Sequence, residues 1–163
     1  MKRLIAAAIA AVAIGSPAQA VPVTGASIAT TRAILTKLVQ VGVTIATPTI
    51  CPSDMWGEYN YSTATLTLCP DTLKNDAMAV ETIAHEAIHA AQHCVGGPLV
   101  STVSPNRVDG YAERIVAAIG HKSRHVLRVT ENLSEAARVR EYEAYAFEGH
   151  PDLVLQILNK VCR

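Results

Sequence analysis

The sequence is short of the features that mark several large protein classes. Its 163 residues include only one Trp, one Phe and five Tyr, and 14 Lys and Arg residues balance 14 Asp and Glu residues. Because there is no basic excess, nothing indicates a nucleic-acid partner, and no block of like charges resembles an interaction tail. The length suits one domain and is too short for two of ordinary size.

Only one long apolar run is present, and it lies at the N-terminus. Two basic residues precede the run Leu4–Ile14, and Ala18-Gln19-Ala20 supplies the small residues that a signal peptidase accepts. The run is too short for a transmembrane helix, which needs about twenty residues. The sequence therefore predicts a signal peptide over residues 1–20 and one secreted or periplasmic domain over residues 21–163, without stable membrane insertion after cleavage. A retained N-terminal anchor is the alternative.

The chain contains only four cysteines: Cys51, Cys69, Cys94 and Cys162. No two of them have the short spacing of a zinc site built on cysteine. An even number in an exported chain indicates disulfides, and four cysteines allow three pairings. We favour Cys51–Cys69, which closes the base of a predicted hairpin, and Cys94–Cys162, which ties the end of a central helix to the chain terminus.

The hydrophobic periodicity of the chain predicts a mostly helical α+β fold with one short sheet. The predicted helices cover Ser27–Val41, Leu73–Cys94, Arg107–His121, Ser134–Glu148, and Pro151 through Val161. Asp71 is expected to cap the second of them. A short strand is predicted at Val43–Ile45, and residues 56–68 are predicted to form a hairpin that bends at Ser62 and Thr63.

The helix predicted over Leu73–Cys94 carries the motif H-E-x-x-H, formed by His85, Glu86 and His89. Residues four apart lie on one face of a helix, so the two imidazoles can bind one zinc ion at about 2.1 Å. Glu86 can face the open side of the metal and take a proton from a zinc-bound water. The alternative is an ordinary buried helix with two hydrogen-bonded histidines.

This motif resembles that of the zincin metallopeptidases, and in particular of the gluzincin branch, whose third zinc ligand is a glutamate from a later helix. The related metzincin pattern is excluded, because Gln92 stands at its glycine position and Val95 at its third histidine position. His93 is also poorly placed as a ligand, since it lies roughly 12 Å from His85 along a helix axis. We expect it to be a rim or packing residue.

Gluzincin third-ligand helices often read E-x-x-A or E-x-x-S, with an Asp one position further on. The segment Glu141-Tyr142-Glu143-Ala144 is similar, and Arg138 precedes it by three residues as in the membrane-type relatives. Tyr145 replaces the Asp that usually orients the first histidine. The resemblance implies three ligands for Zn2+: His85, His89 and Glu141. Glu143 is the alternative ligand, and a solvated acidic face is the alternative for both glutamates.

The resemblance also implies a zincin-like α+β core and zinc-dependent hydrolysis of a peptide bond in a peptide or protein substrate. In such a reaction Glu86 accepts the proton of a zinc-bound water and later passes it to the leaving amine. The strand region Tyr59–Thr67 is expected to pair with an extended substrate. The candidates for the donor that stabilises the oxyanion are Tyr142, Tyr145, His121, His125 and Arg138.

Two other classes of function stay open. One is an exported, zinc-bound but non-catalytic domain that binds a peptide or protein. A fourth protein ligand, either His93 or Glu143, would favour it, whereas the intact Glu86 favours an enzyme. The other is a metal-free helical interaction protein held together by disulfides, and unchanged thermal stability after chelation would support it.

Overall fold

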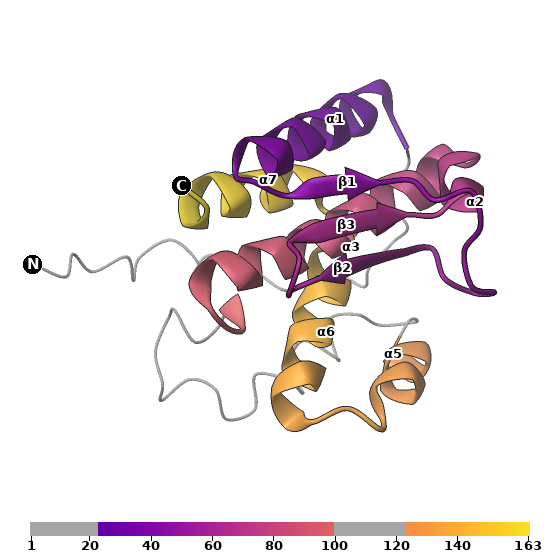
Figure 1. Ribbon diagram of the computed structural model, residues 1–163, viewed down its shortest axis with the longest axis vertical. Coiled ribbons are helices and arrows are strands. Elements are labelled where there is room, and N and C mark those ends of the chain that lie inside the picture. The colour runs from indigo at the N-terminus through magenta and orange to yellow at the C-terminus, as the bar shows by residue number, and fades with distance from the viewer. Residues whose placement is uncertain (1–22, 100–122) are drawn as a thin grey trace, which may run out of the picture.

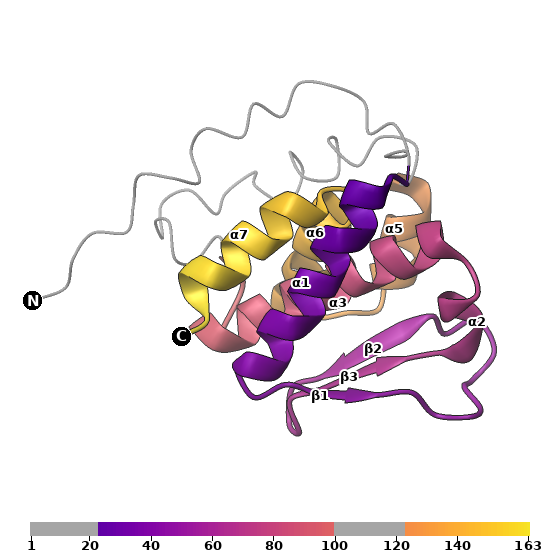
Figure 2. The ribbon, with the colours of Figure 1, turned by 90° about the horizontal axis from the view of Figure 1, so that it is seen from above.

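The computed structural model of the protein describes residues 23–99 and 123–163. A three-stranded sheet covers one side of a group of helices (Figures 1 and 2), which confirms the α+β fold. The helices are α1 (Gly25–Gln40), α2 (Pro70–Leu73), α3 (Asp76–Val95), α5 (Ser123–Thr130), α6 (Glu135–Phe147) and α7 (Pro151–Val161). The strands are β1 (Thr44–Ala46), β2 (Gly57–Asn60) and β3 (Thr65–Leu68).

Helix α3 is the centre of the core. It packs against α1 and α7 on one side and against α6 and β2 on the others. Its buried positions are mostly small or β-branched, and they include Ile83, Ala84, Ala87, Ile88 and Ala91. Small side chains let neighbouring backbones approach closely, which suits a helix that is covered on several sides. In the part of the chain that the structure describes, no helix is long and apolar enough to cross a membrane.

The N-terminal end of the predicted helix Leu73–Cys94 differs from the prediction. Asp71 is not a cap, because it lies in the first turn of α2 and pairs with Lys74 at 2.7 Å. The chain leaves α2 and starts α3 behind Asn75, whose Oδ1 accepts the backbone N–H groups of Ala77 and Met78 at 3.0 and 3.2 Å. An asparagine in this position satisfies two N–H groups that a helix start leaves unpaired, so it begins α3 one residue after Lys74 ends α2.

The predicted hairpin is present, and its bend lies at Ser62 and Thr63 as expected. Both residues donate their backbone N–H to the Asn60 side chain, at 2.9 and 3.2 Å. Strand β3 pairs antiparallel with β2 and parallel with β1, so the strand order is β1-β3-β2. Strand β1 begins one residue later than predicted. Leu66 and Leu68 of β3 are buried against the helices.

Strand β2 forms the outer edge of this sheet on the side of α6 (Figure 1). The N–H of Cys69 donates to the C=O of Trp56 at 3.0 Å, one residue beyond the Gly57–Leu68 pair. Hydrogen-bonded pairs alternate along an antiparallel ladder, so the backbone groups of Gly57 and Tyr59 point away from β3. The edge therefore presents the N–H and C=O groups of these two residues to its outer side.

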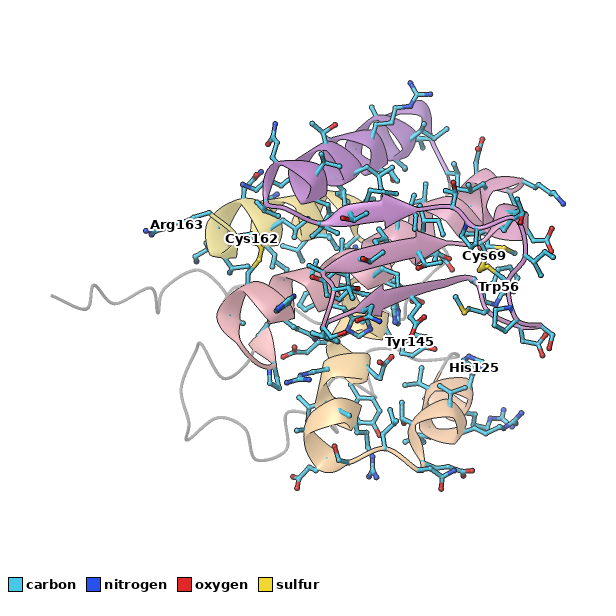
Figure 3. All side chains as sticks on the ribbon, viewed as in Figure 1. Trp56, Cys69, His125, Tyr145, Cys162 and Arg163 are labelled. Atoms are coloured by element: carbon cyan, nitrogen blue, oxygen red, sulfur yellow. A yellow bond between two sulfur atoms is a disulfide. The ribbon has the colours of Figure 1, made fainter. Side chains whose placement is uncertain are left out.

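Two disulfides are present, and both have the favoured pairing. Cys51–Cys69 joins the segment after β1 to the end of β3, and Cys94–Cys162 joins the last turn of α3 to the end of α7 (Figure 3). Cysteines that are all paired in disulfides are typical of proteins from an oxidising compartment. The predicted signal peptide and the predicted helix Arg107–His121 lie outside the described residues.

Described residues 123–163 contain one helix that the sequence analysis did not predict and two that it did. Helix α5 begins at Ser123, and no helix was predicted over its residues. Helix α6 begins behind Ser134, whose side chain accepts the N–H of Ala137, and α7 begins with Pro151 at its first turn. Both of these helices agree with the prediction, because Ser134 and Pro151 are local sequence signals for a helix start.

The close approach of β2 to α3 at Gly57 leads to the first prediction. A Cβ atom on Gly57 would lie 2.7 Å from Thr82 Cγ2 and 3.1 Å from the Thr67 carbonyl oxygen, so one neighbour must move. We expect Gly57→Ala to lower the free energy of unfolding by about 1–3 kcal/mol. Urea titration of the zinc-free protein measures it.

The matched control is Gly25→Ala, since a Cβ atom on Gly25 meets nothing within 4 Å. This change on the surface of α1 is expected to alter the free energy of unfolding by no more than about 0.5 kcal/mol. Equal effects of the two substitutions would show that the contact between β2 and α3 is not tight.

Candidate metal centre

Two elements bring the three predicted ligands together. His85 and His89 lie one turn apart on α3, with ring centroids 5.0 Å apart. Helix α6 crosses α3 and places Glu141 opposite both rings. Glu141 Oε2 lies 3.5 Å from His85 Nε2, and Glu141 Oε1 lies 3.4 Å from His89 Nε2. One ligand atom from each residue falls within 4.8 Å of the others.

The spacing of these atoms fits a tetrahedral zinc site. Zinc binds histidine nitrogen and carboxylate oxygen at about 2.0–2.2 Å, so two ligands of a tetrahedral ion lie about 3.4 Å apart. Each imidazole nitrogen lies at about this distance from a different oxygen of Glu141, at 3.5 Å from Oε2 and 3.4 Å from Oε1, and one atom from each of the three residues lies within 4.8 Å of the others. Two neutral imidazoles and one carboxylate are also a usual donor set for a zinc ion with an open fourth position. The residues present therefore fit zinc.

His85 is oriented by a residue that the sequence analysis missed. Its Nδ1 lies 3.0 Å from Oε2 of the buried Glu148, so an N–H donated there leaves Nε2 free to face Glu141. The position at which an Asp was expected holds Tyr145, whose ring packs edge-on against His85 with centroids 4.6 Å apart. Seven residues span about two helical turns, so the spacing of Glu141 and Glu148 was the available signal.

His89 is held from the opposite side. Its Nδ1 lies 2.9 Å from Gln92 Oε1 and 3.1 Å from the Tyr61 hydroxyl. His93 is exposed, and its Nδ1 lies 2.8 Å from the Tyr59 hydroxyl. His93 is therefore a rim residue, as predicted from the geometry of a continuous helix.

Glu143 lies apart from the histidine pair. It is fully buried, and its Oε2 accepts hydrogen bonds from Gln92 Nε2 at 2.9 Å and from the Leu99 backbone N–H at 2.7 Å. The alternative of a solvated acidic face is thus excluded for Glu143, and Glu141 is also partly buried. Both glutamates point into the protein because α6 is covered by α3 and by the segment that ends at Leu99.

Glu86 lies beside the two histidines at the wall of a cleft. The cleft has a volume of about 1150 Å3 and is lined from β2, the segment before it, α3, α5 and α6; Trp56 of that segment and His125 of α5 both line it (Figure 3). Burial raises the pKa of the Glu86 carboxyl group, and the nearby His85 and His89 oppose this shift. A backbone hydrogen bond from Tyr59, at the outer edge of β2, also lowers it.

The histidines and Glu141 shift one another's protonation. Burial alone would lower the pKa of His85, but hydrogen bonds to Glu141 and Glu148 outweigh it and raise the pKa to about 10. Burial alone would raise the pKa of Glu141, but hydrogen bonds from His85 and His89 hold it well below the ordinary range. Without a metal ion, His85 is therefore protonated on both ring nitrogens at neutral pH.

Of the five candidates for an oxyanion donor, the structure places two at the cleft. Tyr145 and His125 line it, with their rings 6.2 Å apart. Burial, and then the charge of Glu148, raise the pKa of Tyr145 to about 12, so its hydroxyl keeps its proton. Tyr142 is buried elsewhere in α6, and Arg138 donates to the Leu133 carbonyl. His121 lies outside the described residues.

Residues 43–163 match a known protein family, described as Domain of unknown function (DUF8637). The chain belongs to this family. The match covers the sheet, both cysteine pairs and all residues of the candidate metal centre. No curated protein and no solved structure matches the chain. The family membership thus defines the extent of the shared domain without assigning it a reaction.

The second proton of His85, which zinc must displace, leads to the second prediction. Because zinc needs the deprotonated nitrogen, we expect binding to release about one proton per ion at pH 7.5. The apparent affinity should rise about tenfold per pH unit between pH 7 and 9. Calorimetry in two buffers of different ionisation enthalpy counts the protons, and chelator competition gives the affinity. In Glu148→Gln, which removes one cause of the raised pKa, the proton release should be smaller. An affinity independent of pH would contradict this account.

Proposed function

We propose that this protein is an exported zinc-dependent peptidase whose ion is held by His85, His89 and Glu141. The observation that carries the proposal is the ligand spacing of three side-chain atoms from two crossing helices, at the wall of a large cleft. The two disulfides support export, and the apolar N-terminal segment agrees with a secreted or periplasmic location.

Glu86 is the general base and acid of the proposed reaction. When bound here, zinc supplies a Lewis acid that polarises a carbonyl group and acidifies water. Glu86 follows His85 directly on α3 and lines the same cleft, so its carboxylate can accept a proton from the attacking water. Its pKa is raised by burial, which brings it closer to the pH at which it must both accept and return a proton. Glu86 then donates this proton to the leaving amine.

The edge of the sheet can bind the substrate, and Tyr145 can stabilise the oxyanion. The outward N–H and C=O groups of Gly57 and the outward C=O of Tyr59 can pair with an extended peptide, as an added antiparallel strand, while the Tyr59 N–H is bonded to Glu86. This would lay the peptide across the cleft next to Glu86. Tyr145 keeps its proton and lies beside His85, so its hydroxyl is suited to donate to the oxygen on which negative charge develops.

The non-catalytic alternative requires a fourth protein ligand. Both residues that could supply one are engaged elsewhere, since His93 bonds to Tyr59 and Glu143 bonds to Gln92 and Leu99. Among the described residues, no further His, Cys, Asp or Glu joins the cluster of His85, His89 and Glu141. A site with three protein ligands and an open position favours catalysis over a structural role.

The third prediction tests the role of Glu86. We expect Glu86→Gln to bind one zinc ion per chain and to lose about 10²–10⁴-fold in kcat/KM, since the amide cannot accept the proton. A peptide library with mass-spectrometric readout measures cleavage, and metal analysis measures zinc. Glu135→Gln, an exposed change in the first turn of α6, is the control. Normal cleavage by Glu86→Gln would exclude this mechanism.

The charge of the cleft leads to the fourth prediction. No Lys or Arg is among the described residues that line the cleft. Six of these residues carry carboxyl groups: Asp54, Glu58, Glu81, Glu86, Glu141 and Glu148. A cleft of one sign attracts substrates of the other sign and focuses their approach. We therefore expect peptides with Lys or Arg near the cleaved bond to have about tenfold higher kcat/KM at low salt than matched peptides with Glu.

Salt and one substitution test this preference. Raising the ionic strength should narrow the difference between the two peptides, because screening shortens the range of charge interactions. Glu58→Gln, at an exposed site on β2, should also reduce the difference in kcat/KM between the basic and the acidic peptide. A neutral peptide should be cleaved at the wild-type rate. A preference for acidic peptides would contradict the prediction.

A further inference from the structure

The side chain of Gln92 is fully buried between α3 and α6 and makes four hydrogen bonds. Its Nε2 donates to the Arg140 carbonyl and to Glu143 Oε2, both at 2.9 Å. Its Oε1 lies 2.9 Å from the Tyr61 hydroxyl and 2.9 Å from His89 Nδ1. A buried amide with all its groups engaged has one orientation, because a reversed amide would set oxygen against oxygen at both Arg140 and Glu143.

This orientation determines which nitrogen of His89 carries the proton. Since Gln92 Oε1 is an acceptor only, an unprotonated Nδ1 at 2.9 Å would set two lone pairs against each other. The Tyr61 hydroxyl has one hydrogen, which it donates to the same Oε1. Nδ1 of His89 must therefore carry a hydrogen. Nε2 faces Glu141 Oε1 at 3.4 Å; it donates to this carboxylate while the ring is protonated and holds the lone pair when the ring is neutral.

We propose that Gln92, anchored by Glu143, is a positioning residue that holds His89 in the Nδ1–H tautomer and aims Nε2 at the metal. Its part in zinc binding rests on the proposed function, whereas the tautomer does not. Glu143 acts through Gln92: its Oε2 also accepts the N–H of Leu99, which locates the carboxylate independently of the amide. A partner of this kind fixes ring orientation and tautomer of a ligand histidine.

Tyr61 extends the same arrangement to the sheet. It follows β2 directly, and its hydroxyl meets both Gln92 Oε1 and His89 Nδ1, at 2.9 and 3.1 Å. The end of the edge strand is thereby tied to the orientation of a ligand. Tyr59, two residues earlier, makes a similar bond to His93, which is not a ligand. These two tyrosines form a matched pair for experiment.

The direct test needs no variant. The full, oxidised chain is labelled with ¹⁵N-histidine and studied without zinc at pH 8.5, by long-range ¹H–¹⁵N correlation spectra, with His89→Asn to assign the signals. We expect His89 to be protonated on Nδ1. Protonation on Nε2 alone, with no hydrogen on Nδ1, would overturn the proposal.

Substitutions then test whether Gln92 is the cause. In Gln92→Met the hydrogen should move to Nε2, because Glu141 Oε1 lies 3.4 Å from that atom and can accept it. Zinc affinity, measured by chelator competition, should fall about 10- to 100-fold. A Gln92→Met variant that keeps both the tautomer and the affinity would overturn the proposal.

The tyrosine pair gives an independent comparison if Gln92→Met does not fold. Tyr61→Phe should weaken zinc binding about five- to tenfold, since the amide oxygen loses one of its two donors. Tyr59→Phe should leave zinc affinity and the His89 tautomer unchanged. Equal effects of the two would overturn the proposal. Failure to cleave any peptide, by contrast, would count against the proposed function and leave these spectra and affinities valid.

Discussion

The crossing of α6 over α3 is the contact on which the candidate metal centre depends, because it buries carboxylates beside imidazole rings. A buried carboxylate is tolerated only with hydrogen-bond partners or opposite charge around it. Each one here has such a partner: Glu141 has both histidines, Glu148 has His85, Glu143 has Gln92, and Glu86 has the Tyr59 backbone. Every buried carboxylate of the centre thus has a partner, and separating α6 from α3 would leave several of these charges without partners at once.

The rest of the fold holds α3 in place for this contact. Helices α1 and α7 cover its other side, and the Cys94–Cys162 disulfide joins its last turn to the end of α7. Strand β2 approaches its first half so closely at Gly57 that a Cβ atom there would touch Thr82. A site that must hold ligand atoms to within about 0.5 Å needs support of this kind, from rigid elements on several sides.

Prediction from sequence succeeded where the signal is local and failed where elements compete. Ser134 and Pro151 mark the starts of α6 and α7, and the Asn60 side chain fixes the bend of the hairpin, so these were predictable. The start of α3 was not, because Asp71 and Asn75 are both plausible caps and only the folded chain chooses between them. Helix α5 is amphipathic, with Val126 and Thr130 buried four residues apart, but its eight residues are few for a periodicity argument, and contact with α6 supports it.

The residues of the candidate centre also fall into those that local sequence predicts and those that tertiary packing decides. The H-E-x-x-H spacing by itself puts His85 and His89 on one face of a helix, since 3.6 residues per turn allow no other result. Glu141 could be named only by resemblance, and Glu143 stood as an alternative two residues away. The tertiary structure decided that Glu141 reaches the histidines while Glu143 reaches Gln92, and that Glu148 takes the place of the missing Asp. These contacts join residues about fifty or more positions apart, and they depend on how two helices pack, which no local spacing encodes.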